Sequence, residues 1–150
     1  MAQAIYESRA TEAAVARFDA LAYTALGVNR TDAHCLNIVD NEGGSITAGR
    51  LAELAGLTTA AVTAVLDRLE TKGYAQRVRD TSDRRRVLVE LTPAFRERAA
   101  VIWGPMAEEG QRIVERFTAD DIRVVQEWFR LARDANERHA ERIRNLRFED

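Results

Sequence analysis

The chain has 150 residues, of which 46% are hydrophobic and 31% charged, and its formal net charge is −2. This composition is typical of a folded globular protein of one domain, and it excludes an intrinsically disordered chain. The sequence contains no apolar run close to the roughly 18 residues of a membrane span, so a membrane-spanning protein is excluded too.

Two helices are predicted before the first informative motif. Residues 3–26 carry apolar side chains at helical spacing, and Gly27 ends this helix. A second helix is expected from the residue after Thr31, which is the predicted N-cap, to about Asp40. Residues 41–44 read Asn-Glu-Gly-Gly, which predicts a loop.

The next segment predicts a helix-turn-helix. Thr47 can cap a short helix over 48–55, which Gly56 ends. Thr58 can cap a longer helix that ends at Lys72-Gly73. This longer helix has apolar residues at i, i+3, i+4 and i+7, which predicts a buried stripe of Val62, Val65, Leu66 and Leu69. Two short helices joined by a tight turn are typical of this DNA-binding motif.

After Gly73 the apolar period changes to two, which predicts strands at 74–79 and 87–91 with a polar loop between them. The loop contains three consecutive arginines after Asp83, and we expect Asp83 to pair with one of them. Residues 72–89 hold six basic and two acidic residues, hence +4, which leaves −6 for the rest of the chain. A basic hairpin tip on an acidic body predicts a wing that contacts phosphates or the minor groove. The alternative is a solvated charged turn.

Two long helices complete the chain. Thr92 caps and Pro93 opens the first, over about 93–117, and Gly104-Pro105 inside it is expected to kink or interrupt the helix. Residues 118–121 resemble a capping box for the last helix, which covers about 119–145.

The outward face of the predicted second motif helix is small and polar, with Thr58, Thr59, Ala60 and Thr63. Short side chains let a helix sit deep in the major groove, where threonine reaches base edges or phosphates and alanine contacts a thymine methyl. The alternative, an ordinary surface helix of a bundle, is not excluded by the threonines alone.

The combination of motifs resembles the MarR family of bacterial and archaeal regulators. It comprises LDRLETKGY at 66–74, then Arg77, DRRR at 83–86 and LTP at 91–93. The resemblance covers nearly the whole chain. It implies a mainly α fold with a small β-wing in a single domain, 1–150. The winged helix-turn-helix would occupy 31–92, flanked by dimerisation helices at 3–26 and 93–145.

The resemblance also implies a function: a sequence-specific transcriptional regulator, commonly a repressor, that acts as a homodimer on a pseudo-palindromic operator of double-stranded DNA. Two recognition helices would enter successive major grooves about 34 Å apart. Which of the three wing arginines reaches deepest into the minor groove stays open. The implied DNA-contacting residues are Thr58, Thr59, Ala60, Thr63, Arg68, Arg77, Asp83, Arg84, Arg85 and Arg86.

Many members of that family respond to small aromatic or phenolic compounds bound between the dimer region and the winged helix. By resemblance, an effector pocket here would be lined by Tyr23, His34, Ile38 and Trp103. The alternative is that these four residues only pack the fold.

The remaining titratable groups argue against metal and redox chemistry. Cys35 is the only cysteine, lies on an apolar helix face and has no second cysteine to resolve a sulfenic acid, so we interpret it as a buried structural residue. His34 and His139 are far apart in sequence, so we expect no metal site. A single cysteine and an N-terminus unlike a signal peptide indicate the cytoplasm, where the protein would associate with the nucleoid.

Two other classes of function compete with DNA binding. The sequence has no glycine-rich phosphate loop, metal-ligand spacing or nucleophile elbow, so we expect neither an enzyme nor a cofactor. A winged-helix adaptor that binds protein without DNA is the closer alternative. The arginine-rich tip disfavours it, because a protein-binding wing has no reason to concentrate positive charge.

Overall fold

The structure is a computed structural model, and it describes residues 2–80, 83, 86–144 and 146–147. These residues form two compact units, Met1–Gly104 and Pro105–Asp150, each of which is treated by itself below.

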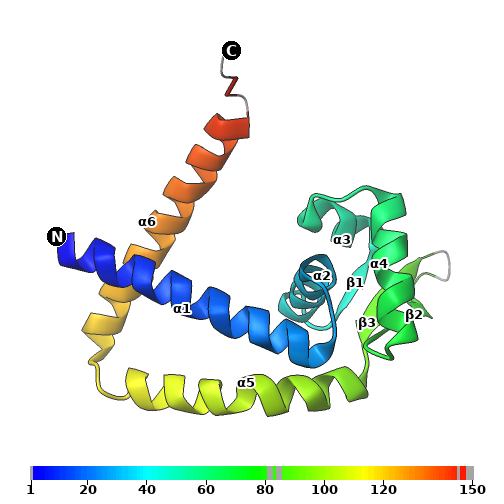
Figure 1. Cartoon of the computed structure of the whole chain (residues 1–150), viewed down its shortest axis with the longest axis horizontal. Coiled ribbons are helices and arrows are strands. Elements are labelled where there is room, and N and C mark those ends of the chain that lie inside the picture. The colour runs from blue at the N-terminus through cyan, green and yellow to red at the C-terminus, as the bar shows by residue number, and fades with distance from the viewer. Residues whose placement is uncertain (1, 81–82, 84–85, 145, 148–150) are drawn as a thin grey trace. The chain divides into compact units, whose positions relative to one another are not determined.

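The described residues form six helices and three short strands (Figure 1). The mainly α fold with a small β-sheet is therefore confirmed. In chain order the elements are α1 (Ala2–Leu26), α2 (Arg30–Asn41), β1 (Ser45–Thr47), α3 (Ala48–Ala55), α4 (Thr59–Thr71), β2 (Ala75–Arg79), β3 (Val87–Leu91), α5 (Pro93–Val114) and α6 (Ala119–Arg144).

The caps of the helix-turn-helix lie where the sequence predicts them. Thr47 Oγ1 accepts a hydrogen bond from the backbone N–H of Arg50 at 3.2 Å, which caps α3. Gly56 ends α3 in the left-handed conformation, with φ of 64°, which glycine adopts without a steric penalty. Thr58 Oγ1 accepts from the N–H of Ala61 at 3.2 Å and caps α4.

The predicted cap of α2 is wrong. Asn29, not Thr31, is the N-cap, because its Oδ1 accepts a hydrogen bond from the N–H of Asp32 at 2.8 Å. An Asn side chain is among the best acceptors for this position. Helix α2 therefore begins at Arg30 and places Asp32 in its first turn.

The sheet is antiparallel in the order β1-β3-β2. The predicted hairpin is confirmed: β2 and β3 pair in a register that runs from Ala75 opposite Leu91 to Arg79 opposite Val87. Strand β1 was not predicted. It pairs with the other edge of β3, and the N–H of Leu91 donates to the carbonyl of Gly44 at 3.1 Å just before it. The wing is thus anchored to the segment that leads into α3.

The core of the first unit forms where the helix-turn-helix meets α2 and the sheet. The predicted α4 stripe is confirmed, since all four of its residues are 1–2% exposed. The stripe belongs to one cluster with residues of α2, α3 and β3, which include Leu36, Val39, Leu51 and Val89. This packing fixes α4 on its inner side and leaves its other side to solvent.

The helices after the wing begin as predicted. Thr92 Oγ1 accepts from the N–H of Phe95 at 3.2 Å at the start of α5. Helix α5 continues through Pro105 to Val114, so the expected interruption is wrong; a proline removes one backbone donor, and the helix tolerates that loss here. At α6 the capping box is confirmed: Thr118 Oγ1 accepts from the N–H of Asp121 at 3.2 Å, and Asp121 Oδ2 accepts from the N–H of Thr118 at 2.9 Å.

Candidate nucleic-acid interface

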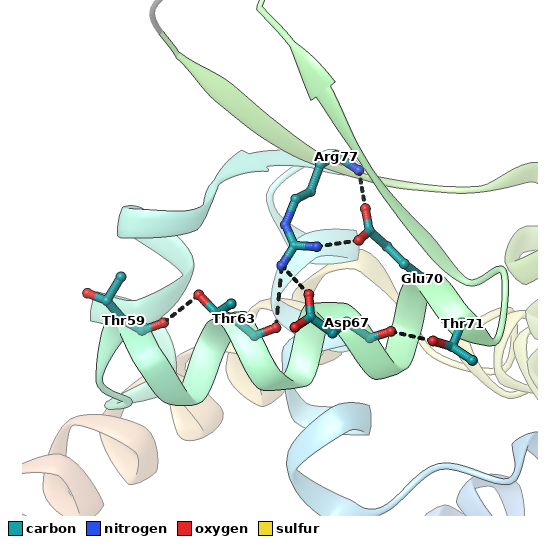
Figure 2. Close-up of polar contacts among 6 residues, drawn as sticks. All are labelled: Thr59, Thr63, Asp67, Glu70, Thr71 and Arg77. Atoms are coloured by element: carbon teal, nitrogen blue, oxygen red, sulfur yellow. Dashed lines mark hydrogen bonds and ion pairs between the residues drawn. The ribbon is translucent and has the colours of Figure 1, made fainter.

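The outward face of α4 carries the residues that the sequence predicted to contact DNA. Thr59, Ala60 and Thr63 are exposed on α4, and Thr58 is exposed directly before it. The hydroxyl of Thr63 donates to the carbonyl of Thr59 at 3.0 Å (Figure 2). That proton is therefore used inside the helix, and the methyl group and an acceptor lone pair of Thr63 remain for a partner.

Arg77 of β2 lies over α4 and contacts it at three points (Figure 2). Its Nη2 donates to Asp67 Oδ1 at 2.8 Å and to the carbonyl of Thr63 at 3.3 Å, and its Nη1 pairs with Glu70 Oε2. The backbone N–H of Arg77 also donates to Glu70 Oε1 at 2.8 Å. Arg77, which the sequence predicted to contact DNA, therefore joins strand β2 of the wing to helix α4.

The surroundings of Arg77 stabilise its charge. Partial burial of the side chain opposes the charged form. The hydrogen bond to Asp67 and the negative charges of Glu70 and Asp67 outweigh this effect and raise the pKa of the Arg77 guanidinium above its ordinary value. The guanidinium therefore takes part in this cluster in its charged form.

Arg68 of α4 is also paired inside the protein. Its Nε donates to both carboxylate oxygens of Asp32 at 3.1 and 3.2 Å, and its Nη2 donates to Asp32 Oδ1 at 2.5 Å. Asp32 is only 1% exposed, whereas the Arg68 side chain is 46% exposed. The hydrogen bond to Asp32 raises the pKa of Arg68. Arg68 joins α4 to α2 and keeps part of its guanidinium at the surface.

The base of the wing is organised by Asp80, a residue for which the sequence predicted no role. Asp80 Oδ1 accepts from the N–H of Asp83 at 3.3 Å, and Asp80 Oδ2 lies 3.9 Å from Nε of Arg86. Two backbone bonds close the loop, from Asp80 N to Arg86 O at 3.0 Å and from Arg86 N to Asp83 O at 2.8 Å. An aspartate directly after a strand is a recognisable turn signal. Arg84 and Arg85 lie outside the described residues.

Tyr74 joins three segments of the first unit. Its buried hydroxyl donates to the carbonyl of Leu26 at 3.0 Å and accepts from Nη1 of Arg98 at 2.6 Å. The Arg98 guanidinium also lies 5.3 Å from the centre of the Tyr74 ring, and the Phe95 ring packs at 5.7 Å. The end of α1, the start of β2 and the start of α5 therefore meet at one side chain.

The residues predicted for an effector pocket do not share one environment. Tyr23, Ile38 and Trp103 are partly buried against the core, and His34 is exposed. A cavity of about 340 Å³ lies between the end of α1 and the start of α5, and none of these four residues lines it. Its lining residues are Ala25, Leu26, Glu97, Arg98, Val101 and Ile102.

Cys35 is fully buried, as predicted. Burial raises the pKa of its thiol, the charge of Asp32 raises it further, and Arg68 opposes both. The thiol therefore stays protonated near neutral pH, which lowers its reactivity. Within the described part of the chain, no three His, Cys, Asp or Glu residues are grouped so that they could hold a metal ion.

Among the residues that the structure describes, no single helix is long and apolar enough to cross a membrane. Helices α3 and α4 meet that test only as a pair bent by 109°.

The α3–α4 pair and the β2–β3 hairpin together define a winged helix-turn-helix protein. The model of the MarR family matches residues 26–86. The uncharacterised HTH-type transcriptional regulator YcgE of Bacillus subtilis (strain 168) is 34% identical over 127 residues, which cover 85% of this chain and 82% of that protein. The chain belongs to the MarR family of transcriptional regulators.

Solved structures share the fold. A MarR-like regulator from Thermotoga maritima is 26% identical with a TM-score of 0.64, and the match covers 89% of this chain and 96% of that one. MepR of S. aureus in complex with DNA has a TM-score of 0.58 at 19% identity, with coverages of 88% and 97%. NadR in complex with 4-hydroxyphenylacetate has a TM-score of 0.59 at 20% identity, with coverages of 85% and 89%.

Proposed function

We propose that this protein regulates transcription by binding double-stranded DNA in a sequence-specific manner. One observation carries the proposal: the exposed Thr and Ala face of α4 lies on the helix to which Arg77 ties the basic hairpin. A helix and a two-stranded ribbon held together can occupy a major groove and the neighbouring minor groove at the same time. Family membership and the fold shared with the MepR–DNA complex support this function.

The protein would act as a homodimer on a pseudo-palindromic operator, most simply as a repressor. The second unit supports this assembly. Within the described residues, α6 buries none of its side chains in the chain itself, and it exposes Val124, Val125, Trp128, Phe129 and Leu131. An apolar helix face of this kind needs a partner, and a second copy of the chain supplies one with matching symmetry.

An effector would modulate the complex. The proposed ligand is a small aromatic or phenolic compound, in line with the 4-hydroxyphenylacetate held by NadR. Release of DNA by such a ligand is the simplest regulatory scheme. The protein would then work in the cytoplasm, bound to the nucleoid.

DNA binding is tested by fluorescence anisotropy with a labelled duplex from upstream of the protein's own gene, next to a scrambled duplex of equal length. We expect tighter binding to the upstream duplex and a steep loss of affinity as salt rises. Absent or salt-independent binding would contradict the proposal and favour the protein–protein adaptor.

A further inference from the structure

We propose that Arg77 is a positioning residue of the DNA-binding surface and does not itself contact DNA. It holds β2 against the recognition helix α4 and offsets the negative charge of Asp67 and Glu70. The inference rests on the proposed DNA-binding function. It gives Arg77 a role other than the direct contact implied by resemblance.

The first argument is the geometry of the cluster (Figure 2). The guanidinium reaches Thr63, Asp67 and Glu70, which are spaced i, i+4 and i+7 along one face of α4. Glu70 also accepts the backbone N–H of Arg77. The strand is therefore held to two turns of the helix by both its main chain and its side chain.

The second argument is electrostatic. The Asp67 side chain is 64% exposed and that of Glu70 is 33% exposed, and both lie on the helix that carries Thr63. Two carboxylates and one guanidinium give this cluster a net charge of −1, and removal of the Arg77 charge would change it to −2. Carboxylates at a DNA-facing helix repel phosphates, so Arg77 favours DNA binding without touching a phosphate.

The third argument is the comparison with Arg79. It lies two residues further along β2, on the same face of the strand. Arg79 is exposed, and the described part of the chain shows no ion pair for it. Arg77 is only 30% exposed, and turning it toward DNA would break its bonds to both carboxylates. Arg79 is thus a matched control, an exposed arginine on the same surface.

The experiment measures the affinity of full-length variants for the upstream duplex over a series of salt concentrations. R77M keeps the apolar stem of the side chain and removes its charge. We expect it to bind about tenfold more weakly or worse, because two carboxylates are left without their partner. The triple variant D67N/E70Q/R77M removes the repulsion and keeps an acceptor at position 70. We expect it to regain most of the affinity, with the salt slope of the wild type.

The control pair is R79M and D67N/E70Q/R79M. The carboxylate changes should not restore the affinity of R79M, because Arg79 is not bonded to those groups. Rescue confined to the Arg77 background supports the part of the inference in which Arg77 offsets the charges of Asp67 and Glu70.

Three results would overturn the inference. The first is that R77M binds like the wild type, and the second is that the triple variant binds as weakly as R77M. The third is that the salt slope of R77M is lower than that of the wild type by about 0.9, as expected when one phosphate is no longer neutralised. If R77M does not fold, R77K is tested in its place. The lysine keeps the positive charge, but its single ammonium group cannot make all the hydrogen bonds of the planar Arg77 guanidinium. Weaker binding of R77K at unchanged slope supports the inference, and wild-type affinity contradicts it. Wild-type protein that binds no duplex refutes the proposed function itself, which is a different outcome.

Discussion

Asp32 and Arg68 form an ion pair between the first turn of α2 and helix α4, with a nearly inaccessible carboxylate and a half-exposed guanidinium. The Nδ2 of Asn29 donates to the same carboxylate at 3.1 Å. The helix that would read DNA is thereby fixed on α2 by a polar contact in addition to its apolar stripe.

Removing only the cation of this pair should be costly, because the buried carboxylate would be left without its main partner. We expect R68M to lower the free energy of unfolding by about 2 kcal/mol, which is below the roughly 3–5 kcal/mol for a fully buried pair because Arg68 is partly solvated. The double variant D32N/R68M should recover part of this stability. Urea unfolding followed by circular dichroism measures both, and R68M as stable as the wild type would contradict the assignment.

The wing arginines should supply affinity without sequence preference. We expect R84A/R85A to weaken binding to upstream and scrambled duplexes by similar factors. The salt slope should fall by about 0.9 for each phosphate that the variant no longer neutralises. The dimer should stay intact in size-exclusion chromatography. Unchanged affinity for both duplexes would refute the wing as a DNA-binding element.

Thr63 should affect sequence preference instead. T63F puts a bulky ring on the exposed face of α4, where it would keep the helix from the base edges. We expect the affinity for the upstream duplex to fall more than that for the scrambled duplex in the same anisotropy assay. An equal fall for both duplexes would mean that Thr63 does not face bases.

The apolar face of α6 gives a test of the dimer. Phe129 is 64% exposed in the chain, so a charge there costs an isolated chain little. In a dimer, F129E would bury an unpaired carboxylate, and we expect a monomer in light scattering together with weak operator binding. The matched control is Q126E, at an exposed polar position of the same helix. A dimeric F129E would place the interface elsewhere.

The cap of α6 predicts a local pH effect. The hydrogen bond from the Thr118 hydroxyl, and then that from the Thr118 N–H, lower the pKa of Asp121 below 3.8. Since the folded pKa is depressed, the cap contributes above the unfolded value of 3.8 and its contribution disappears as pH falls through the folded value. In T118A, we expect the pKa of Asp121 to move back toward 3.8 in an NMR titration. An unmoved pKa would contradict the assigned cause.

The sequence predicted the elements that follow from local chemistry. Thr47, Gly56 and Thr58 mark helix ends because cap residues act on the backbone next to them, and the α4 stripe follows from helical spacing. Strand β1 escaped prediction because three residues carry no readable period, and only pairing with the far edge of β3 makes them a strand. The predicted cap of α2 lies two residues too late because Asn29 and Thr31 can both cap.

The ion pairs at the candidate interface could not be predicted in the same way. Arg68 and Asp32 are 36 residues apart, and their contact depends on how α2 packs against α4. Arg77 lies seven residues from Glu70, but across the end of a helix and the start of a strand, so its partners follow from the turn at Gly73. A basic residue in a DNA-binding motif is therefore weak evidence for a DNA contact until its carboxylate partners are known.

The Tyr74 hydroxyl links two helices to the root of the wing. Its oxygen accepts a hydrogen bond from Arg98 of α5 and donates one to the carbonyl of Leu26, the last residue of α1. Tyr74 itself lies immediately before β2, the strand that leads into the wing. The end of α1 is thereby hydrogen-bonded to the residue directly before the hairpin. The wing is thus connected to the N-terminal helix through a tyrosine whose backbone N–H also donates to the carbonyl of Leu69 in α4, so α1, α4 and the hairpin share one residue.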